Sequence, residues 1–151
     1  MDYSQPNRER RLNWKEYALR LAFTASERSE DPYQQVGSCA LNKDHMVLGL
    51  GYNGLASGKD ADPLMFWQDR DERRKYMIHA ESNCLSLCKK GEVDILAVTL
   101  SPCSSCATMI AAYGVKNVIY SDLYERDSSA LDIFKFYNIL VEQVELYRDG
   151  N

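Results

Sequence analysis

The sequence predicts an α/β domain in three layers, α-β-α, with a five-stranded mixed sheet covered by helices on both faces. Segments with helical apolar spacing alternate with short β-compatible segments, in the order α-β-β-α-β-α-β-α-β. One sheet between two layers of helices satisfies that order most simply. The 151 residues, 45% of them hydrophobic, can bury a core of this kind, so residues 1–151 are expected to form a single domain.

The first half of the chain is expected to form a long helix and then an antiparallel hairpin. Asn13 and Glu16 have the spacing of a capping box, and the apolar residues that follow repeat at helical intervals to about Arg28. The segments "VGSCALN" and "MVLGLGYN" are β-compatible and flank the turn "NKDH". The long connection over 55–78 is expected to contain a short helix near 66–76, and such connections are more often functional than idle.

The second half is expected to alternate between helix and strand to its end. Serine or proline at a helix start and glycine just after its end are the usual boundary residues. They predict the following helices: His79 to about Lys90 with Gly91 after it, Pro102 to Gly114 with Ser101 as N-cap, and Ser128 or Ser129 to about Tyr137. The segments "ILAVTL", "NVIY" and "ILVEQVEL" are expected to be the remaining strands.

Charge and hydropathy argue against several classes of partner. The formal net charge is −4, which disfavours broad electrostatic binding of nucleic acid, whereas a small anionic ligand needs only a local cationic pocket. No apolar run approaches the ~20 residues of a membrane span. The N-terminal "MDYSQPNRERRLN" has no secretory h-region, so we expect a cytoplasmic, reducing location and no membrane partner. The basic runs over 8–11 and 70–75 are mixed with acids and are expected to be solvated faces.

Two short motifs predict a metal centre. The segment "SPCSSC" places Cys103 and Cys106 on one turn at a helix start, where the helix dipole and free N–H groups favour the thiolate form. The segment "HAESN" supplies His79. Two helices that leave neighbouring strands on the same side of a sheet would bring these three side chains together. Two thiolates and one imidazole form a soft ligand set suited to one catalytic Zn2+ ion, with a fourth position open to water.

Glu81 is expected to act as a general acid and base rather than as a ligand. A carboxylate beside a water that zinc activates can accept a proton and relay it to a ring nitrogen and to departing ammonia. The pattern H-x-E…P-C-x-x-C is the signature of zinc deaminases with these roles. Structural zinc and a redox dithiol are the other interpretations of the cysteine pair. A fourth structural ligand would have to come from Cys39, Cys84 and Cys88, which we expect in the core, or His45, which we expect to be exposed in the hairpin turn.

Beyond the zinc motifs, the chain resembles the deoxycytidylate (dCMP) deaminase family over most of its length. The segments that carry the resemblance are "ERSEDPYQQVG" (27–37), "GYNG" (51–54), "HAESN" (79–83), "SPCSSCA" (101–107) and "GVKNVIYSD" (114–122) with Tyr124. The resemblance implies a cytidine deaminase-like fold, hydrolysis of dCMP to dUMP and ammonia, and a homo-oligomer, specifically a hexamer. Members are commonly activated by dCTP with Mg2+ and inhibited by dTTP, and some viral relatives also deaminate dCTP.

The resemblance also implies a set of substrate-binding residues. They are Arg28, Ser29, Asn53, Ala80, Tyr120 and Tyr124. A monophosphate carries about −1.5 to −2 charges and needs a cation and hydrogen-bond donors, for which Arg28 and Ser29 are the candidates. The Asn53 amide could bind the sugar hydroxyl or the base, and the two tyrosines could flank the nucleotide. Each residue also has a structural interpretation, as a helix cap, a turn residue or a core aromatic.

Effector binding is implied at a second group of residues. These are Gly51, Tyr52 and Gly54 in the "GYNG" segment, and a cation late in the helix that follows His79, for which Lys90 or Lys89 is the candidate. Because some relatives carry arginine there, the sequence leaves open whether regulation is retained.

Several functions remain open from the sequence. The chain could act on dCTP, or on cytidine and deoxycytidine, in addition to dCMP or instead of it, whereas tRNA editing is disfavoured by the acidic balance. A non-catalytic zinc module that binds nucleotides or proteins is the alternative from a different class. A second metal ion is not expected in the long connection, because His45 is the only histidine or cysteine between Asn42 and His79.

Overall fold

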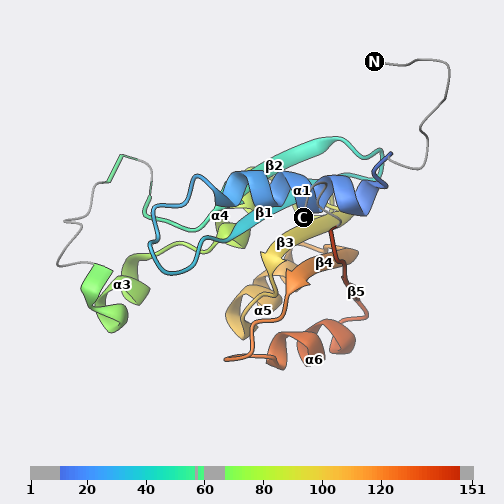
Figure 1. Ribbon diagram of the computed structural model, residues 1–151. Helices are drawn as coiled ribbons and strands as arrows, with labels where there is room; N and C mark the ends of the chain where they lie inside the picture. Colours follow the sequence, from blue (N-terminus) through green and yellow to red (C-terminus); the bar gives the residue numbers. More distant parts are fainter. Residues whose placement is uncertain (1–10, 57, 60–66, 147–151) are drawn as a thin grey trace, which may run out of the picture.

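The computed structural model describes residues 11–56, 58–59 and 67–146, and its helices and strands follow the predicted order (Figure 1). The helices are α1 (Trp14–Ser26), α3 (Arg70–Tyr76), α4 (Ala80–Leu85), α5 (Ser104–Ala112) and α6 (Ser129–Phe136). The strands are β1 (Gly37–Leu41), β2 (Val47–Tyr52), β3 (Ile95–Leu100), β4 (Asn117–Asp122) and β5 (Leu140–Gln143).

The strands form one mixed sheet, as predicted, and their order in it is β2-β1-β3-β4-β5. β1 pairs antiparallel with both β2 and β3, whereas β3, β4 and β5 run parallel to one another. β2 therefore runs in the same direction as β3. As a result, the C-terminal ends of β2, β3, β4 and β5 lie at one edge of the sheet, where side chains from distant parts of the chain can meet.

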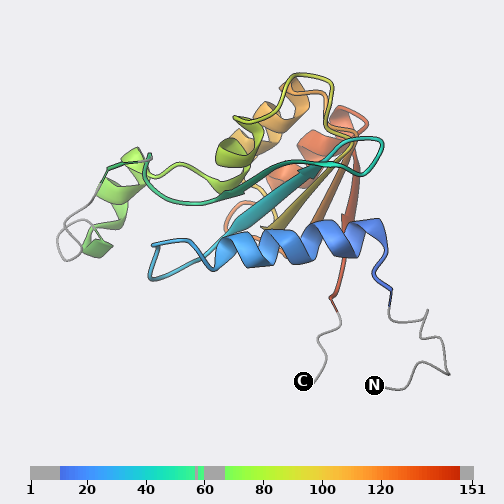
Figure 2. The same ribbon diagram turned by 90° about the horizontal axis from the view of Figure 1, so that it is seen from above.

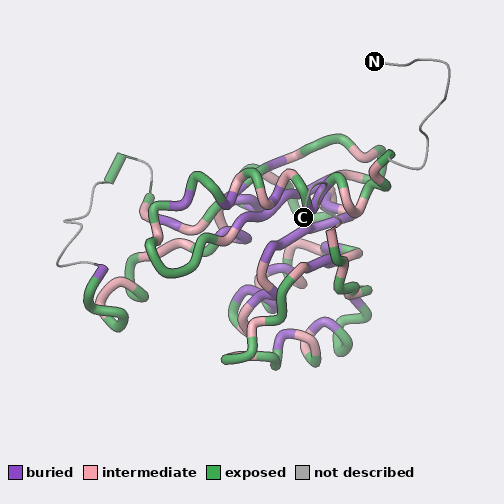
Figure 3. Tube along the Cα trace, in the orientation of Figure 1, coloured by how far each residue is buried: buried purple, intermediate pink, exposed green. Residues whose placement is uncertain are grey.

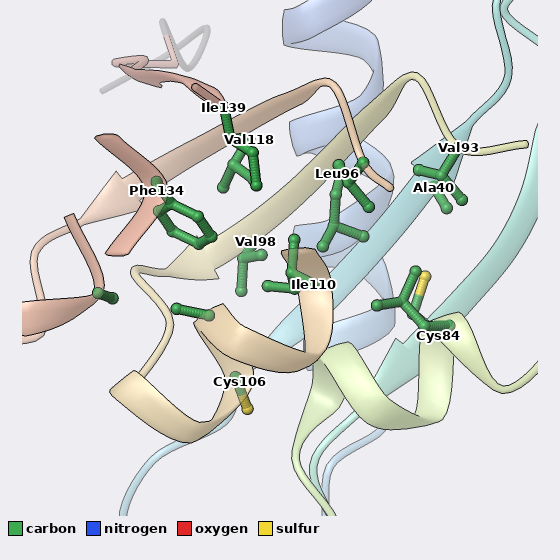
Figure 4. Packing of buried hydrophobic residues seen from close by; sticks show 14 residues of the cluster. Ala40, Cys84, Val93, Leu96, Val98, Cys106, Ile110, Val118, Phe134 and Ile139 are labelled. Carbon is green, nitrogen blue, oxygen red and sulfur yellow. The ribbon is translucent and has the colours of Figure 1, made fainter. Parts of the chain in front are cut away.

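Helices cover both faces of the sheet, which confirms the three layers (Figure 2). Side chains that face α1 alternate along the strands with those that face α4, α5 and α6, as the pleat requires. The cluster under α1 includes Cys39, Leu41, Ile95, Ala97 and Ile119. The cluster under the other three helices includes Ala40, Leu96, Val98, Val118 and Phe134 (Figure 4). Figure 3 shows the buried residues concentrated along the strands and the inner helix faces.

The capping box predicted at the start of α1 is present. Asn13 Oδ1 accepts a hydrogen bond from the Glu16 N–H at 2.8 Å, and Glu16 Oε1 accepts one from the Asn13 N–H at 3.0 Å. The helix ends at Ser26, slightly before the predicted Arg28, and the Arg28 N–H continues the chain in a turn by donating to the Ala25 carbonyl. The local pattern was therefore sufficient to place this helix.

The ends of α4 and β5 differ from the prediction. α4 ends at Leu85 rather than near Lys90. The Leu87 and Cys88 N–H groups bond at 3.2 and 2.9 Å to carbonyls three residues back, which tightens the chain into turns instead of continuing the helix. β5 covers 140–143, a shorter range than the predicted strand. In the described part of the chain, no helix has the length and hydropathy that crossing a bilayer requires.

The start of α5 also differs from the prediction. The helix begins at Ser104 with Cys103 as its N-cap, rather than at Pro102 with Ser101 as the cap. The Ser101 hydroxyl instead accepts a hydrogen bond from the Tyr124 N–H at 2.6 Å, and this bond joins the end of β3 to the segment after β4. Ser101 is therefore used in tertiary structure and is not available to cap the helix.

The long connection after β2 is closed at its base by a short antiparallel bridge. The Gly54 N–H donates to the Ile78 carbonyl at 3.0 Å, and the Ile78 N–H donates to the Gly54 carbonyl at 2.8 Å. The short helix predicted within this connection is α3, which stands beyond the edge of the sheet (Figures 1 and 2). The bridge holds Ile78 beside the end of β2, so His79 and α4 begin at the sheet edge.

Candidate metal centre and substrate cleft

The two predicted metal motifs meet at the edge of the sheet. His79 is the N-cap of α4 and follows the bridge at Ile78, while Cys103 is the N-cap of α5 and follows the end of β3. We expected these helices to leave neighbouring strands, but β1 lies between β2 and β3. The two helix starts converge because β2 and β3 run in the same direction and end at the same edge.

His79, Cys103 and Cys106 form a three-ligand group. The His79 Nδ1 lies 3.1 Å from the Cys106 Sγ and 3.6 Å from the Cys103 Sγ, and the three ligand atoms lie within 4.8 Å of one another. A tetrahedral zinc site with ordinary bond lengths has N···S separations of roughly 3.6 Å and S···S separations of roughly 3.8 Å. The geometry of the three side chains therefore fits one Zn2+ ion.

The pKa values of His79, Cys103 and Cys106 are shifted by the contacts among these three side chains. Hydrogen bonds with Cys106 and His79 lower the pKa of Cys103 to about 4, which favours its thiolate form. The bond to Cys103, together with burial, raises the pKa of the Cys106 thiol. The bond with Cys103 also raises the pKa of His79, against burial and the positive charge of Arg74. A bound divalent ion would displace these protons and stabilise both sulfurs as thiolates.

The Glu81 carboxyl is buried beside the three ligands. The residue is 4% exposed, and burial raises the pKa of the carboxyl, although its own backbone N–H, the charge of His79 and the Cys106 thiol all oppose this shift. A buried carboxyl of this kind can take up a proton and release it again, as a general acid and base must. The side chain predicted to relay protons is thus beside the predicted ligands.

Two of the three ligands, His79 and Cys103, border one cleft of about 1160 Å³ together with Glu81 and α3. The third ligand, Cys106, is buried behind them. Its walls come from segments far apart in the sequence: the loop over 31–36, α3, the starts of α4 and α5, and the loop over 123–127. Pockets that hold small ligands commonly have volumes of ~300–1,000 Å³. The cleft can therefore admit a molecule of nucleotide size to the metal centre.

The predicted substrate residues divide into two sets. Asn53, Ala80 and Tyr124 line the cleft, whereas Arg28, Ser29 and Tyr120 do not. Arg28 is exposed after α1 and Tyr120 is buried in β4. Ser29 is buried, and its hydroxyl donates a hydrogen bond to the Asn53 carbonyl at 2.8 Å. A role in substrate binding for the second set stays a prediction, without support from the lining of the cleft.

The Asn53 side chain is held by the loop over 31–36. Its Oδ1 accepts a hydrogen bond from the Val36 N–H at 2.9 Å. Its Nδ2 donates to the Gln34 carbonyl at 2.9 Å and to Asp31 Oδ2 at 3.4 Å. The amide therefore shapes the cleft wall, and a direct contact with substrate would compete with these bonds.

The predicted effector residues lie outside the cleft lining. Gly51 packs directly against α4, where an added Cβ would lie 2.4 Å from the Cys84 nitrogen and 2.5 Å from the Ala80 carbonyl oxygen. The Tyr52 carbonyl accepts a hydrogen bond from Asn83 of α4 at 2.7 Å. Lys90 is exposed beyond the end of α4, and Gly54 forms the bridge with Ile78. These contacts explain the "GYNG" segment by packing, and its effector role stays a prediction.

Sequence reasoning missed a group of arginines in the cleft. The run over 70–75 was expected to be a solvated face, but Arg70, Arg73 and Arg74 line the cleft from α3, and Arg126 lines it from the loop over 123–127. A signal was present, because residues at i, i+3 and i+4 share one face of a helix. Residues 8–10 of the other basic run lie outside the described residues.

The other cysteines and the second histidine have structural roles. Cys39 and Cys84 are fully buried, and burial raises the pKa of Cys39 to about 12 and raises that of Cys84 also. Cys88 is half-buried and packs against the core cluster that contains Cys84. His45 is half-buried rather than exposed, because its ring stacks on Trp14 with 4.5 Å between the ring centroids.

Comparison with known proteins identifies the family. The family model described as the cytidine and deoxycytidylate deaminase zinc-binding region matches residues 12–122. The chain belongs to this deaminase family. The deoxycytidylate deaminase of Mus musculus is 35% identical over 151 residues, which cover 91% of this chain and 83% of the mouse protein. The deoxycytidylate deaminase of Mycobacterium phage D29 is 33% identical over 123 residues, which cover 73% of this chain and 95% of the phage protein.

A solved structure of a family member has the same fold. The crystal structure of dCMP deaminase from the cyanophage S-TIM5, in complex with dCMP and dUMP, is similar to this chain with a TM-score of 0.74 at 28% identity. The similarity covers 93% of this chain and 100% of the phage chain. Together with the five-stranded mixed sheet, it confirms the predicted cytidine deaminase-like fold.

Proposed function

We propose that this chain catalyses the zinc-dependent hydrolytic deamination of dCMP to dUMP and ammonia, with residues 1–151 acting as one deaminase domain. The observation that carries the proposal is the group of one imidazole and two thiols within 4.8 Å of one another, with the buried carboxyl of Glu81 beside it. Family membership and the similarity to the mouse and human deoxycytidylate deaminases support the same reaction.

His79, Cys103 and Cys106 are the residues that would hold the ion. When bound, Zn2+ supplies Lewis-acid chemistry and lowers the pKa of a water molecule to about 7. A set of three protein ligands is typical of catalytic zinc, since structural sites are usually closed by four. No other set of three histidine, cysteine or carboxylate ligands in the described ranges is close enough together to hold an ion.

Glu81 would move the protons of the reaction. Its carboxylate accepts a proton from the attacking water and donates it to the ring nitrogen next to the carbon that carries the amine. It then accepts the second water proton and delivers it to the departing ammonia. One water is consumed, a C–O bond forms and the C–N bond breaks. Proton transfer by a positioned group of this kind contributes about 10²–10⁴-fold to the rate.

The proposed substrate is the nucleoside monophosphate, with dCTP or the nucleosides cytidine and deoxycytidine as the alternatives. The phage relative of known structure was crystallised with dCMP and dUMP, which supports this choice. Ala80, Asn53 and Tyr124 would form the walls around the base and sugar, because all three line the cleft. The family resemblance also implies Arg28, Ser29 and Tyr120 as contacts, although none of the three lines the cleft.

Assembly and regulation are also proposed from the family resemblance. The chain would form a homo-oligomer, a hexamer, activated by dCTP with Mg2+ and inhibited by dTTP, with Gly51, Tyr52, Gly54 and Lys90 at the effector site. Large apolar side chains exposed on α1 and β2 support self-association: Trp14, Tyr17, Val47 and Leu50. A reducing compartment, the cytoplasm, suits the free thiols of the metal centre.

Replacement of Glu81 by glutamine tests the reaction. Glu81→Gln has the same shape but cannot accept a proton, so ammonia release from dCMP should fall by at least ~10²-fold while bound zinc stays at the wild-type level. Glu27→Gln, at an exposed position after α1, removes the same charge and serves as the control. Parallel assays with dCTP, cytidine and deoxycytidine identify the preferred substrate. Wild-type turnover of dCMP by Glu81→Gln would refute the proposed mechanism.

A further inference from the structure

Three arginines of α3 face the substrate cleft. Arg70, Arg73 and Arg74 have the spacing i, i+3 and i+4, which places their side chains on one face of the helix, and all three line the cleft. α3 ends at Tyr76, shortly before the metal ligand His79. These cations are thus part of the cleft wall that leads into the metal centre.

The positive charge on this wall has no carboxylate partner in the described part of the chain. The ion pairs there join Lys75 to Glu72, at 3.1 Å, and Lys15 to Glu142. The Lys75–Glu72 pair lies on α3 itself, and neither of its residues lines the cleft. The ion pair on α3 therefore neutralises the charge of Lys75, which lies outside the cleft. The three guanidinium groups inside the cleft have no such partner among the described residues and can bind an anion.

The acids of the cleft do not neutralise this wall. Asp31 accepts hydrogen bonds from backbone N–H groups of its own loop at 2.8 and 3.2 Å. Asp127 accepts one from the first N–H of α5 at 2.9 Å. Glu81 is buried beside the metal ligands, and Glu125 is exposed on the loop over 123–127. Most carboxylates of the cleft therefore bond to backbone N–H groups or lie at the reaction centre, and none of these described carboxylates forms an ion pair with the arginines of α3.

Arg73 is held in a fixed position on the wall. Its guanidinium lies 4.3 Å from the centre of the Tyr33 ring, and its Nη1 donates a hydrogen bond to the Trp67 carbonyl at 2.9 Å. A guanidinium has five N–H donors, so these contacts leave others free. A planar cation that is already oriented can bind two phosphate oxygens at a smaller entropic cost than a free side chain.

We propose that the arginine face of α3, formed by Arg70, Arg73 and Arg74, binds the 5′-phosphate of the nucleotide and makes the cleft select nucleotides over nucleosides. This assignment rests on the proposed deamination of a cytosine nucleotide. A monophosphate carries about −1.5 to −2 charges and three acceptor oxygens, which match two or three guanidinium groups. Arg28, the candidate from the sequence, lies outside the cleft lining, so the α3 face replaces it as the phosphate site.

The test compares substrates with and without the phosphate. Arg70→Ala and Arg74→Ala, singly and together, should each lower the ratio of kcat/KM for dCMP to kcat/KM for deoxycytidine by about 10–100-fold, with a smaller loss at high salt. Calorimetric binding of dUMP and deoxyuridine gives the same ratio without turnover. Lys75→Ala is the matched control, because it removes a positive charge from the same helix outside the cleft. Both arginines are exposed, so these variants are expected to fold.

The outcomes separate this inference from the proposed reaction. If an active, zinc-loaded enzyme keeps its preference for dCMP and dUMP in the Arg70→Ala, Arg74→Ala double variant, the α3 assignment is overturned and the reaction stands. A loss of that preference in Arg28→Ala alone would also overturn it. If the wild-type protein with full zinc releases ammonia from neither dCMP nor deoxycytidine, the proposed reaction fails, and the α3 assignment fails with it.

Discussion

Gly51 is the position where a single methyl group should disturb the reaction centre. An added Cβ would lie 2.4 Å from the Cys84 nitrogen and 2.5 Å from the Ala80 carbonyl oxygen, both of them backbone atoms of α4. Because atoms in contact normally lie about 3.5–4.0 Å apart, Gly51→Ala requires β2 and α4 to separate by roughly 1 Å. α4 begins directly after His79 and carries Glu81, so this displacement would move the proposed metal ligand and the proposed proton relay together.

The close contact of the added Cβ with α4 sets the expected loss of stability and of activity in Gly51→Ala. Overpacking of this kind costs about 1–3 kcal/mol of unfolding free energy. In a chain of this length that corresponds to a fall in Tm of about 2–12 °C. A displacement of about 1 Å at reacting groups can lower the rate by ~10²-fold. Thermal unfolding by circular dichroism and ammonia release from dCMP measure the two effects on the same zinc-loaded sample.

Gly54→Ala is the matched control at the end of the same hairpin. The nearest atom to a Cβ at Gly54 is Glu30 Oε1 at 3.1 Å, a side-chain atom that also accepts a hydrogen bond from the Leu55 N–H at 3.0 Å and needs to shift by only a few tenths of an ångström. This variant should therefore stay close to the wild type in Tm and turnover. If Gly51→Ala matched the wild type, or if the two variants were equally damaged, close packing of Gly51 against α4 would not be the reason for glycine at this position.

Two further predictions concern the metal and Asp127. Removal of zinc with a chelator should abolish ammonia release, and added Zn2+ should restore it. The far-UV circular dichroism should stay unchanged throughout, because the core holds α4 and α5 in place. Loss of the helical signal would show a structural metal instead. Asp127 accepts hydrogen bonds from the Ser129 hydroxyl and from the Ser104 and Ser129 N–H groups, which lower its pKa from 3.8 to about 2. Since the folded-state pKa is depressed, ionised Asp127 stabilises the fold above its unfolded pKa, and this contribution disappears as the pH falls towards 2. The difference in Tm between the wild type and Asp127→Asn should shrink over that range, and a difference independent of pH would contradict the assignment.

The fold could be predicted where local patterns decide it. The capping box of α1 needs only Asn13 and Glu16, and the period of apolar residues is enough to place the five strands. The start of α5 could not be predicted, because the partner of the Ser101 hydroxyl is the Tyr124 N–H, 23 residues away. Serine is a good N-cap in isolation, but tertiary structure used its oxygen for another bond.

In the candidate site, too, the residues in short motifs could be predicted, whereas those that depend on tertiary packing could not. His79, Cys103 and Cys106 could be predicted because their chemistry is specific and their spacing is short. The arginines of α3 could not be assigned in advance, because which face of a helix meets a cleft depends on the packing of distant segments. Asn53 shows a third case: its place on the cleft was expected, but its amide is already bonded to the loop over 31–36.

The bridge between Gly54 and Ile78 allows the long connection to vary in evolution independently of the position of His79. Changes in the length of a closed loop alter its closure entropy only slowly, by about 0.6 kcal/mol for each doubling. Insertions and deletions between these two residues can therefore accumulate without moving His79 relative to β2, because the paired backbone groups fix where the excursion begins and ends. Substrate range can diversify in that interval while the ligands on the far side of the bridge keep their positions.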